Sequence, residues 1–186
     1  MDALEALHTR SSNPKLSDPM PDPQALENIY KAAFRAADHA VLRPWRFLLI
    51  SGEARERLGD LFAETALMAD PAVSEEKLQS VRLKPLRAPL IIVTICSPQP
   101  HPKVPEIEQE LSAAAATQNM LLAAYAQNVG AIWRTGSMAY AKHVRQGLGL
   151  ATHEKITAFL YLGTVTGAVK HLNDPPVDDY FRTWQA

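Results

Sequence analysis

The chain has 186 residues, of which 47% are hydrophobic and 21% charged, and its formal net charge is -1. This length suits a single domain, residues 1–186, with a core of its own, and the composition is that of an ordinary globular protein. A nearly neutral chain without a long basic run argues against a nucleic-acid binder held by phosphate contacts.

Several catalytic classes also lose their main support. The single cysteine, Cys96, excludes an internal disulfide and a cysteine-based zinc site. Because it ends an apolar run, a small core residue is favoured over a nucleophile. The six histidines lack the spacing of metal ligands, so no metal site is expected. The glycine signatures of Rossmann and P-loop sites are absent, as is the Gly-x-Ser-x-Gly motif of hydrolases.

The N-terminal residues 2–9 predict a short amphipathic helix, and their acidic start is unlike a secretory signal, so we expect a cytoplasmic protein. The helix is followed by Arg10, Ser11 and Ser12, which Pro14 keeps in a turn. Hydroxyls, backbone amides and a guanidinium in such a turn suit an anion such as a phosphate. Taken alone, an exposed arginine at a helix end is the simpler interpretation of Arg10.

A second helix is predicted to begin at Pro23 and to close near Arg35 and His39. A buried strand over residues 46–51 comes next. The polar loop that carries His39 and Arg43 therefore lies between a helix and a strand, which is a usual place for a binding site.

Residues 53–69 and 74–83 predict two further helices, and their many charges suggest a solvated, mobile excursion without chemistry of its own. A second strand is predicted over residues 90–96.

The longest predicted helix, residues 110–128, contains neither Gly nor Pro and is rich in alanine. Apolar residues surround it almost completely, which indicates a buried helix. Polar residues interrupt it too often for a membrane span, so no membrane association is expected. Gly130 is expected to stop the helix, and a short strand over 131–133 then leads into Arg134 and Thr135.

The remaining chain predicts a helix near 140–148, a buried strand over 158–165 and a tail from residue 166 onwards. The tail carries Tyr180 and Trp184 but cannot fold by itself, so we expect it to cover this subunit or a partner subunit. Few strands alternating irregularly with helices predict an α+β domain.

Three polar clusters remain, and each lies at the end of a predicted element. They are Arg10–Ser12, Arg35–Arg43 and Trp133–Thr135. Together they offer cations, hydroxyls, an imidazole and an aromatic face, a set that suits a planar ligand carrying a phosphate. Their spacing alone does not bring them together.

At these clusters the chain resembles the nitroreductase family of FMN-dependent oxidoreductases, and the likeness covers nearly the whole chain. Arg10-Ser11-Ser12 resembles the Arg-Arg-Ser signature of that family. The segment from Arg35 to Phe47 resembles its Ala-Pro-Ser to Gln-Pro-Trp-x-Phe segment. The alanine-rich helix that leads into residues 130–136 resembles its central helix and following strand. These features and the short length are closest to a small bacterial subgroup of NAD(P)H nitroreductases.

The resemblance implies a small, mainly antiparallel central sheet surrounded by helices, with a long buried central helix and an extended C-terminal tail. It also implies a homodimer with two FMN molecules at the subunit interface, where the central helix lies. NADH or NADPH would be the co-substrate, and nitroaromatic, quinone or related small acceptors would be reduced in a ping-pong sequence. No catalytic side chain is implied, because the chemistry belongs to FMN.

The resemblance assigns site residues by position. Those implied to bind FMN are Arg10, Ser11, Ser12, Arg35, His39, Trp133, Arg134 and Thr135. Those implied to lie near the nicotinamide cofactor are Ala123, Ala124, Tyr125, Ala126, Gln127 and Asn128. Trp133 is interpreted as a wall or packing residue, since an indole N–H does not titrate usefully.

Some positions depart from the family pattern. Ser11 replaces the second arginine of the signature, Val41 stands where asparagine is common, and Arg43 replaces the usual glutamine. Two hypotheses are open for the added cation at Arg43, which are stabilisation of a reduced, anionic flavin and attraction of an acidic substrate.

Two other classes of protein explain the same residues. One is a flavin-binding or storage protein without turnover, which needs the same phosphate and ring contacts. The other is a helical interaction module, in which the alanine-rich helix only dimerises and the arginines are solvated.

Overall fold

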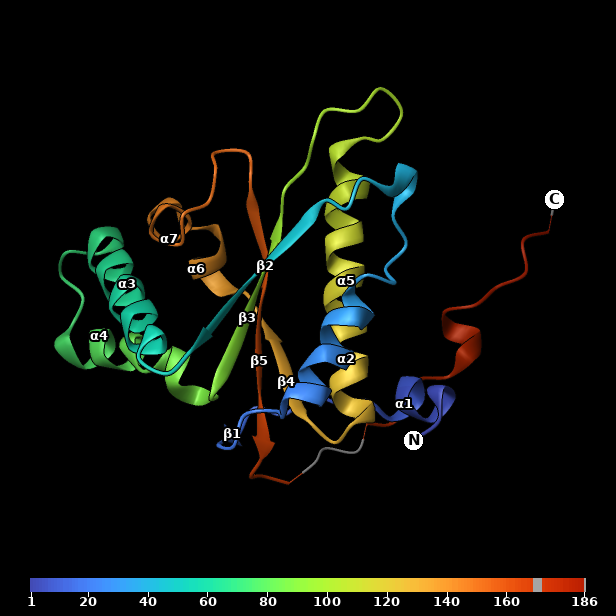
Figure 1. Ribbon diagram of the computed structural model, residues 1–186, viewed down its shortest axis with the longest axis horizontal. Helices are drawn as coiled ribbons and strands as arrows, with labels where there is room; N and C mark the ends of the chain where they lie inside the picture. The colour runs from blue at the N-terminus through green and yellow to red at the C-terminus, as the bar shows by residue number, and fades with distance from the viewer. Residues whose placement is uncertain (169–171, 186) are drawn as a thin grey trace.

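A five-stranded antiparallel sheet separates two layers of helices in this computed structural model, which describes residues 1–168 and 172–185 (Figure 1). The helices are α1 (Ala3–Thr9), α2 (Pro23–Ala33), α3 (Ala54–Ala69), α4 (Glu75–Arg82), α5 (Glu106–Ala126), α6 (Gly136–Tyr140) and α7 (Lys142–Gly147), with short 3₁₀ turns η1 (His39–Val41), η2 (Lys84–Arg87) and η3 (Val177–Asp179). The strands are β1 (Leu16–Ser17), β2 (Trp45–Ser51), β3 (Leu90–Cys96), β4 (Gly130–Arg134) and β5 (Lys155–Val165). The predicted α+β class, with one small antiparallel sheet, is confirmed.

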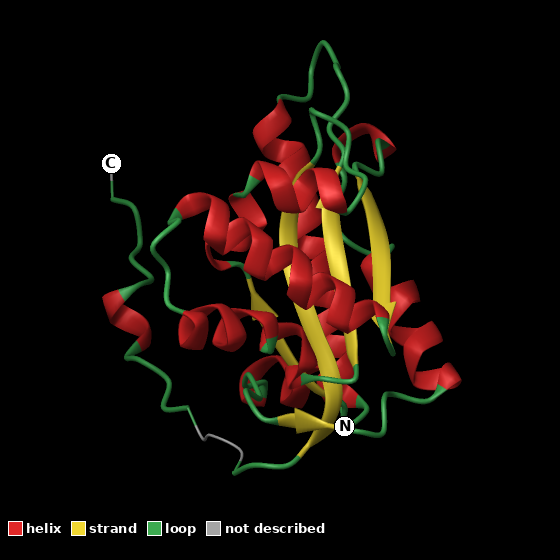
Figure 2. Ribbon diagram, turned by 90° about the vertical axis from the view of Figure 1, so that its left-hand side faces the viewer, coloured by secondary structure: helices red, strands yellow, loops and turns green. Residues whose placement is uncertain are grey.

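Helices cover both faces of the sheet, which lies edge on between them in Figure 1, and Figure 2 looks onto one of these faces with helices in front of the strands. All seven residues of β3 are buried, and their side chains alternate between the two faces. Ile91 and Val93 belong to the core shared with α3, α6 and α7. Leu90 and Ile92 belong to the core shared with α2 and α5. Burial on both faces explains why this strand is a continuous apolar run without alternation.

Strand order decides where the loops emerge. β5 pairs with β3 and, on its other side, with β4, because both partners face the same stretch of β5 near Phe159–Leu162. β3 pairs in turn with β2. The order β4-β5-β3-β2 therefore puts β4 and β2 on opposite edges of the sheet.

The long helix α5 lies against the sheet beside α2 (Figure 1). The Thr117 hydroxyl lies 3.0 Å from that of Thr94 in β3, and both residues are fully buried. The predicted long central helix is confirmed, and its face towards the sheet is buried. In this single chain Ile107 and Leu111 on its outer surface are 58% and 61% exposed, which leaves room for the contact with a second subunit that the resemblance implies. Among the described residues, no helix is long and apolar enough to cross a membrane.

Gly130 does not stop the helix as predicted. α5 ends at Ala126, and Asn128 takes the left-handed conformation that follows many helix ends, with φ 59°. Gly130 instead begins β4, where a Cβ atom would lie 2.5 Å from Leu16 Cδ2. A side chain here would press on Leu16 and Val165, so glycine suits the close approach of β1 to β4.

The prediction of a solvated excursion after residue 53 is also wrong. α3 and α4 cover one face of the sheet and bury Leu58, Phe62 and Val81. The Phe62 ring packs edge to face on Phe159 of β5, with 5.4 Å between centroids. The charges lie on the outer faces of these helices, so a high charge content did not exclude a core contact.

Smaller differences concern element boundaries. α2 ends at Ala33, before the predicted close, and the helix predicted near 140–148 is two helices, α6 and α7, divided at Ala141. β5 begins three residues earlier than predicted, and the two-residue strand β1 was not predicted at all.

The tail follows the end of β5, and its last stretch extends away from the body (Figures 1 and 2). The prediction spans residues 166–186, of which 169–171 and 186 lie outside the described residues. Tyr180, Phe181 and Trp184 are exposed, the last by 88%. In this single chain these aromatic side chains therefore remain available for a partner.

An ion pair joins β2 to the loop before β5. The Glu154 carboxylate, 5% exposed, accepts bonds of 2.6 Å from Arg46 Nε and Nη2 and one of 2.8 Å from the Ala151 amide. Chiefly the bonds from Arg46 lower the pKa of Glu154 from 4.5 to about 2. A lowered pKa means that the charged form stabilises the fold above pH 4.5 and that this contribution is lost as the pH falls towards 2.

We expect Glu154→Gln to lower the free energy of unfolding by about 1–3 kcal/mol at pH 7, because a charge-assisted pair is lost in a buried place. Urea unfolding at pH 7 and pH 3 measures the effect, which should shrink at the lower pH. Glu53→Gln is the control, since its 3.9 Å pair with Arg57 is exposed and should contribute little. An equal effect of Glu154→Gln at both pH values would contradict the assignment.

Candidate functional site

The end of β4 presents two of the predicted residues to opposite faces of the sheet. Trp133 packs against the core shared with α2 and α5. Arg134 points to the other face, where its guanidinium carbon lies 5.7 Å from the centre of the Tyr161 ring. Burial raises the pKa of the Tyr161 hydroxyl to about 12, so this ring stays neutral beside the cation.

A cavity of about 350 Å³ opens on the Arg134 side of β4. It is lined by Thr135 and Gly136 of the following turn, and by Lys84 and Arg87 from η2. Burial lowers the pKa of Lys84, and the positive charges of Lys77, Arg87 and Arg134 lower it further. Three cations line one cavity, so an anionic ligand is the one that it favours.

Lys84 and Arg87 were not among the predicted site residues. Their only sequence signal is a pair of cations around Pro85, immediately before β3. That signal has no meaning until the fold brings η2 to the cavity that Arg134 lines.

The Arg10–Ser12 segment lies along the same edge of the sheet. The amide of Asn13 donates a 2.9 Å hydrogen bond to the carbonyl of Ala131 in β4. Among the described residues, Ser11 Oγ and Arg134 Nε are buried without a hydrogen-bond partner. A hydroxyl and a guanidinium left without partners suit the phosphate and polar ring atoms of a nucleotide-like ligand.

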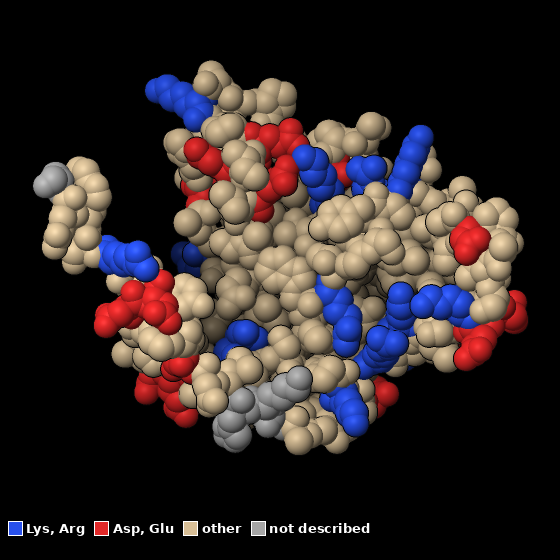
Figure 3. Space-filling view, turned by 180° about the vertical axis from the view of Figure 1, so that it is seen from behind, with Lys and Arg blue, Asp and Glu red and all other residues tan. Residues whose placement is uncertain are grey.

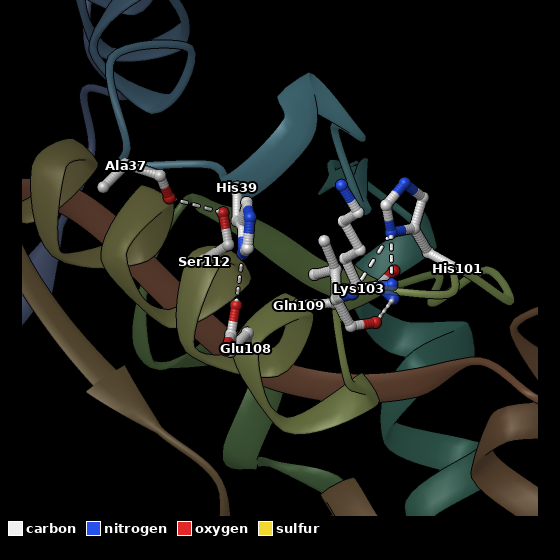
Figure 4. A network of polar contacts seen from close by, with 8 residues as sticks. Ala37, His39, His101, Lys103, Glu108, Gln109 and Ser112 are labelled. Atoms are coloured by element: carbon white, nitrogen blue, oxygen red, sulfur yellow. Dashed lines mark hydrogen bonds and ion pairs between the residues drawn. The ribbon is translucent and has the colours of Figure 1, made fainter.

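The second group of predicted residues lies at the N-terminal half of α5 (Figure 4). His39 Nδ1 lies 2.7 Å from Glu108 Oε2, and Ser112 Oγ donates a 2.7 Å bond to the carbonyl of Ala37. Gln109 binds the loop that precedes α5 through the backbone of Gln99. α5 thus holds two loops in place, one of which carries His39.

Arg35 lies between α2 and that loop. It lines a cavity of about 720 Å³ together with Arg43 and with Trp45 and Phe47 of β2. It also borders a shallower apolar hollow between α1, α2 and α5.

The two groups lie far apart within one chain. Trp133–Thr135 leaves the β4 edge of the sheet, whereas Trp45 and Phe47 belong to the β2 edge, three strand spacings or about 14 Å away. Along α5, the contact of His39 with Glu108 and that of Thr9 with Tyr125 are 17 residues, or about 25 Å, apart. The structure brings Arg10–Ser12 and Trp133–Thr135 to one edge and does not bring His39 to them.

Residues 123–128, predicted to lie near nicotinamide, stay an untested prediction. Ala124 is fully buried in the core, and the Tyr125 hydroxyl contacts Thr9. Gln127 bonds to the side chain of Asn28 and the carbonyl of Ala123. Asn128, at the helix end, is exposed.

The charge distribution agrees with an anionic ligand. On the face seen from behind, Lys and Arg side chains gather in a band below the centre, while acidic side chains lie towards its margins (Figure 3). A basic band of this kind attracts anions over several ångströms.

The sequence model of the nitroreductase family matches residues 7–164. The chain therefore belongs to the nitroreductase family, as its resemblance predicted.

Individual relatives support the same family. The Escherichia coli (strain K12) protein "Putative NAD(P)H nitroreductase YdjA" is 42% identical over 164 residues, which are 88% of each chain. A protein from Haemophilus influenzae (strain ATCC 51907 / DSM 11121 / KW20 / Rd) with the corresponding name is 36% identical over 165 residues, covering 88% of this chain and 89% of the relative. The predicted likeness to this bacterial subgroup is confirmed.

Solved structures agree on the fold. A nitroreductase-like family protein from Bacillus cereus superposes with a TM-score of 0.83 at 22% identity, covering 100% of this chain and 97% of that one. A nitroreductase with bound FMN from Bacteroides fragilis NCTC 9343 gives a TM-score of 0.74 at 18% identity, covering 99% and 100%.

Cys96 is fully buried at the end of β3, and burial raises the pKa of its thiol to about 11. We therefore expect the native protein to react with a thiol reagent at pH 8 at least about 100-fold more slowly than the urea-unfolded protein. In the folded protein the reagent cannot reach the sulfur, and little of the thiol is ionised to thiolate. Stopped-flow titration with an aromatic disulfide measures both rates. Comparable rates would show an accessible thiol and reopen a role as nucleophile.

Proposed function

We propose that this protein is an FMN-dependent oxidoreductase that uses NADH or NADPH to reduce nitroaromatic, quinone or related small acceptors. Family membership supports the class of enzyme. The name of the Escherichia coli relative supports the nicotinamide co-substrate, and the FMN bound to the Bacteroides fragilis protein supports the cofactor.

The residues at the β4 edge fit FMN. Arg10–Ser12 would hold the phosphate through a guanidinium, hydroxyls and backbone amides. The turn at Trp133–Thr135 would line the ring system, with Lys84 and Arg134 supplying positive charge beside it. The buried, unpartnered Ser11 Oγ and Arg134 Nε would gain acceptors. When bound, FMN supplies the transfer of reducing equivalents between the nicotinamide and the acceptor.

The side chains position and polarise the reactants, and none acts as a nucleophile. Trp133 is a wall, because it packs into the core and its indole does not exchange protons near neutral pH. Lys84, Arg87 and Arg134 favour whichever ligand state carries more negative charge. Because the nicotinamide would leave before the acceptor is reduced, the kinetics are expected to be ping-pong. Residues 123–128 remain our proposal for the nicotinamide contact.

The protein acts as a homodimer in this proposal, and the separation of its two residue groups is the observation that carries it. His39 contacts the N-terminal half of α5 and Arg35 lines the cavity at the β2 edge, whereas Trp133–Thr135 leaves the β4 edge of the same chain. A single FMN can meet both groups only if a second copy supplies one of them. The exposed Ile107 and Leu111 on α5 give that copy an apolar surface to cover.

An anaerobic titration tests the function. The purified protein, loaded with FMN, should lose its yellow colour on addition of NADH or NADPH and regain it with a nitroaromatic or quinone. The absorbance near the flavin maximum records both steps. A yellow protein that does not bleach would support an FMN store instead, and a colourless protein that cannot be reconstituted would contradict FMN binding itself.

Subunit complementation tests the shared site. Arg134→Glu and Arg35→Glu should each weaken FMN binding by at least about tenfold, because a charge-assisted contact becomes a repulsion. Refolding the two variants together yields heterodimers with one intact site, so about one quarter of all sites should recover. FMN fluorescence quenching counts these sites.

Each variant refolded alone is the control for this experiment. A mixture that binds no more FMN than the separate variants would mean that both arginines serve the same chain's site, which contradicts the homodimeric arrangement.

A further inference from the structure

A cavity of about 720 Å³ lies at the β2 edge of the sheet, between the end of α2 and the loop that follows it. Three aromatic side chains form part of its wall, namely Phe34 at the end of α2 and Trp45 and Phe47, which share one face of β2. The volume falls in the range of small-molecule sites, and flat aromatic walls suit a planar ligand.

Two arginines, Arg35 and Arg43, line the same cavity. Neither guanidinium forms an ion pair within the part of the chain that the structure describes. The carboxylate that shares the lining, Asp38, accepts a 2.7 Å bond from the backbone amide of Arg43. The lining therefore has an excess of positive charge that a ligand anion would balance.

The loop that carries Arg43 is held in a strained conformation. Ala40, Val41 and Arg43 all have positive φ values, 62°, 53° and 50°, which side chains with a Cβ atom rarely adopt. Two hydrogen bonds hold the loop in this conformation. The Asp38 carboxylate accepts one from the Arg43 amide, and Gln99 Nε2 donates the other to the Leu42 carbonyl at 2.9 Å. Strain held in this way is typical of segments that present a residue to a ligand.

We propose that this cavity is the acceptor site and that Arg43 makes it prefer planar aromatic acceptors that carry a carboxylate or another anionic group. The proposal rests on the proposed function, because the dimer would place this cavity of one subunit beside the FMN of the other. Of the two roles open for Arg43, the acceptor role is favoured, since the cavity has an aromatic wall and volume of its own.

Binding without turnover tests the site first. The oxidised, FMN-loaded protein is titrated with 4-nitrobenzoate and with neutral 4-nitrobenzyl alcohol of nearly the same shape, and calorimetry gives both dissociation constants. We expect the carboxylate to bind about tenfold more tightly, as a charge-assisted contact to a partly exposed guanidinium would give. Arg43→Gln should remove most of this preference, and Arg43→Lys should restore part of it.

Arg57→Gln is the matched control, because it removes the same charge from an exposed position on α3, away from the cavity. It should leave the ratio of the two constants within about twofold of the wild type. Melting followed by circular dichroism checks that all variants fold. Equal binding of both ligands by the wild type, or an equal loss in Arg43→Gln and Arg57→Gln, would overturn the proposal.

Turnover separates this proposal from the proposed function. With NADH or NADPH present, the ratio of kcat/KM for the two acceptors should follow the binding ratio in each variant. Selective carboxylate binding without any bleaching by NADH or NADPH would contradict the oxidoreductase but leave the anion site standing. Bleaching and reduction of both acceptors with equal kcat/KM would contradict the anion site alone.

Discussion

The pairing of β5 with β3 on one side and β4 on the other is the constraint on which the arrangement of this protein depends. It fixes β4 and β2 as opposite edges, so the turn after β4 and the loop before β2 emerge far apart. Gly130 suits the close contact between β1 and β4. The hydrogen bond from the Asn13 amide to the Ala131 carbonyl places Arg10–Ser12 at the same edge. In the described part of the chain, one edge thus has two buried polar atoms without partners, Ser11 Oγ and Arg134 Nε, and three cations. The other edge has two arginines beside three aromatic side chains. Neither edge is a complete site for a ligand that needs both.

The helix α5 connects these two edges and gives each its rigidity. Its buried face packs on β3 and β5 with alanines, so the helix approaches the sheet closely, and the Thr117–Thr94 contact satisfies polar groups within that layer. Its N-terminal half binds the loop of His39 through Glu108 and Ser112. Its outer surface keeps Ile107 and Leu111 in contact with solvent. A second copy that covers this surface would bring one chain's β2 edge towards the other chain's β4 edge, which is why dimerisation and cofactor binding are one proposal.

Much of this could be predicted from the sequence, because the signals were local. Continuous apolar runs identified β3 and the later part of β5, and the absence of charge identified α5. The polar clusters at Arg10–Ser12 and Trp133–Thr135 were visible as residues at element ends. What failed depended on long-range contacts. Lys84 and Arg87 become site residues only because the fold brings η2 to the cavity that Arg134 lines, and the core role of α3 depends on the contact of Phe62 with Phe159. The separation of His39 from Trp133 follows from strand order, which no residue pattern in this chain records.

A crystal structure of the FMN-loaded protein tests the central claim most directly. The account predicts two FMN molecules per dimer, each within hydrogen-bonding distance of Arg10–Ser12 and Trp133–Thr135 of one chain and of Arg35 or His39 of its partner. An FMN that contacts residues of one chain only, or a monomer that binds FMN fully, would contradict it.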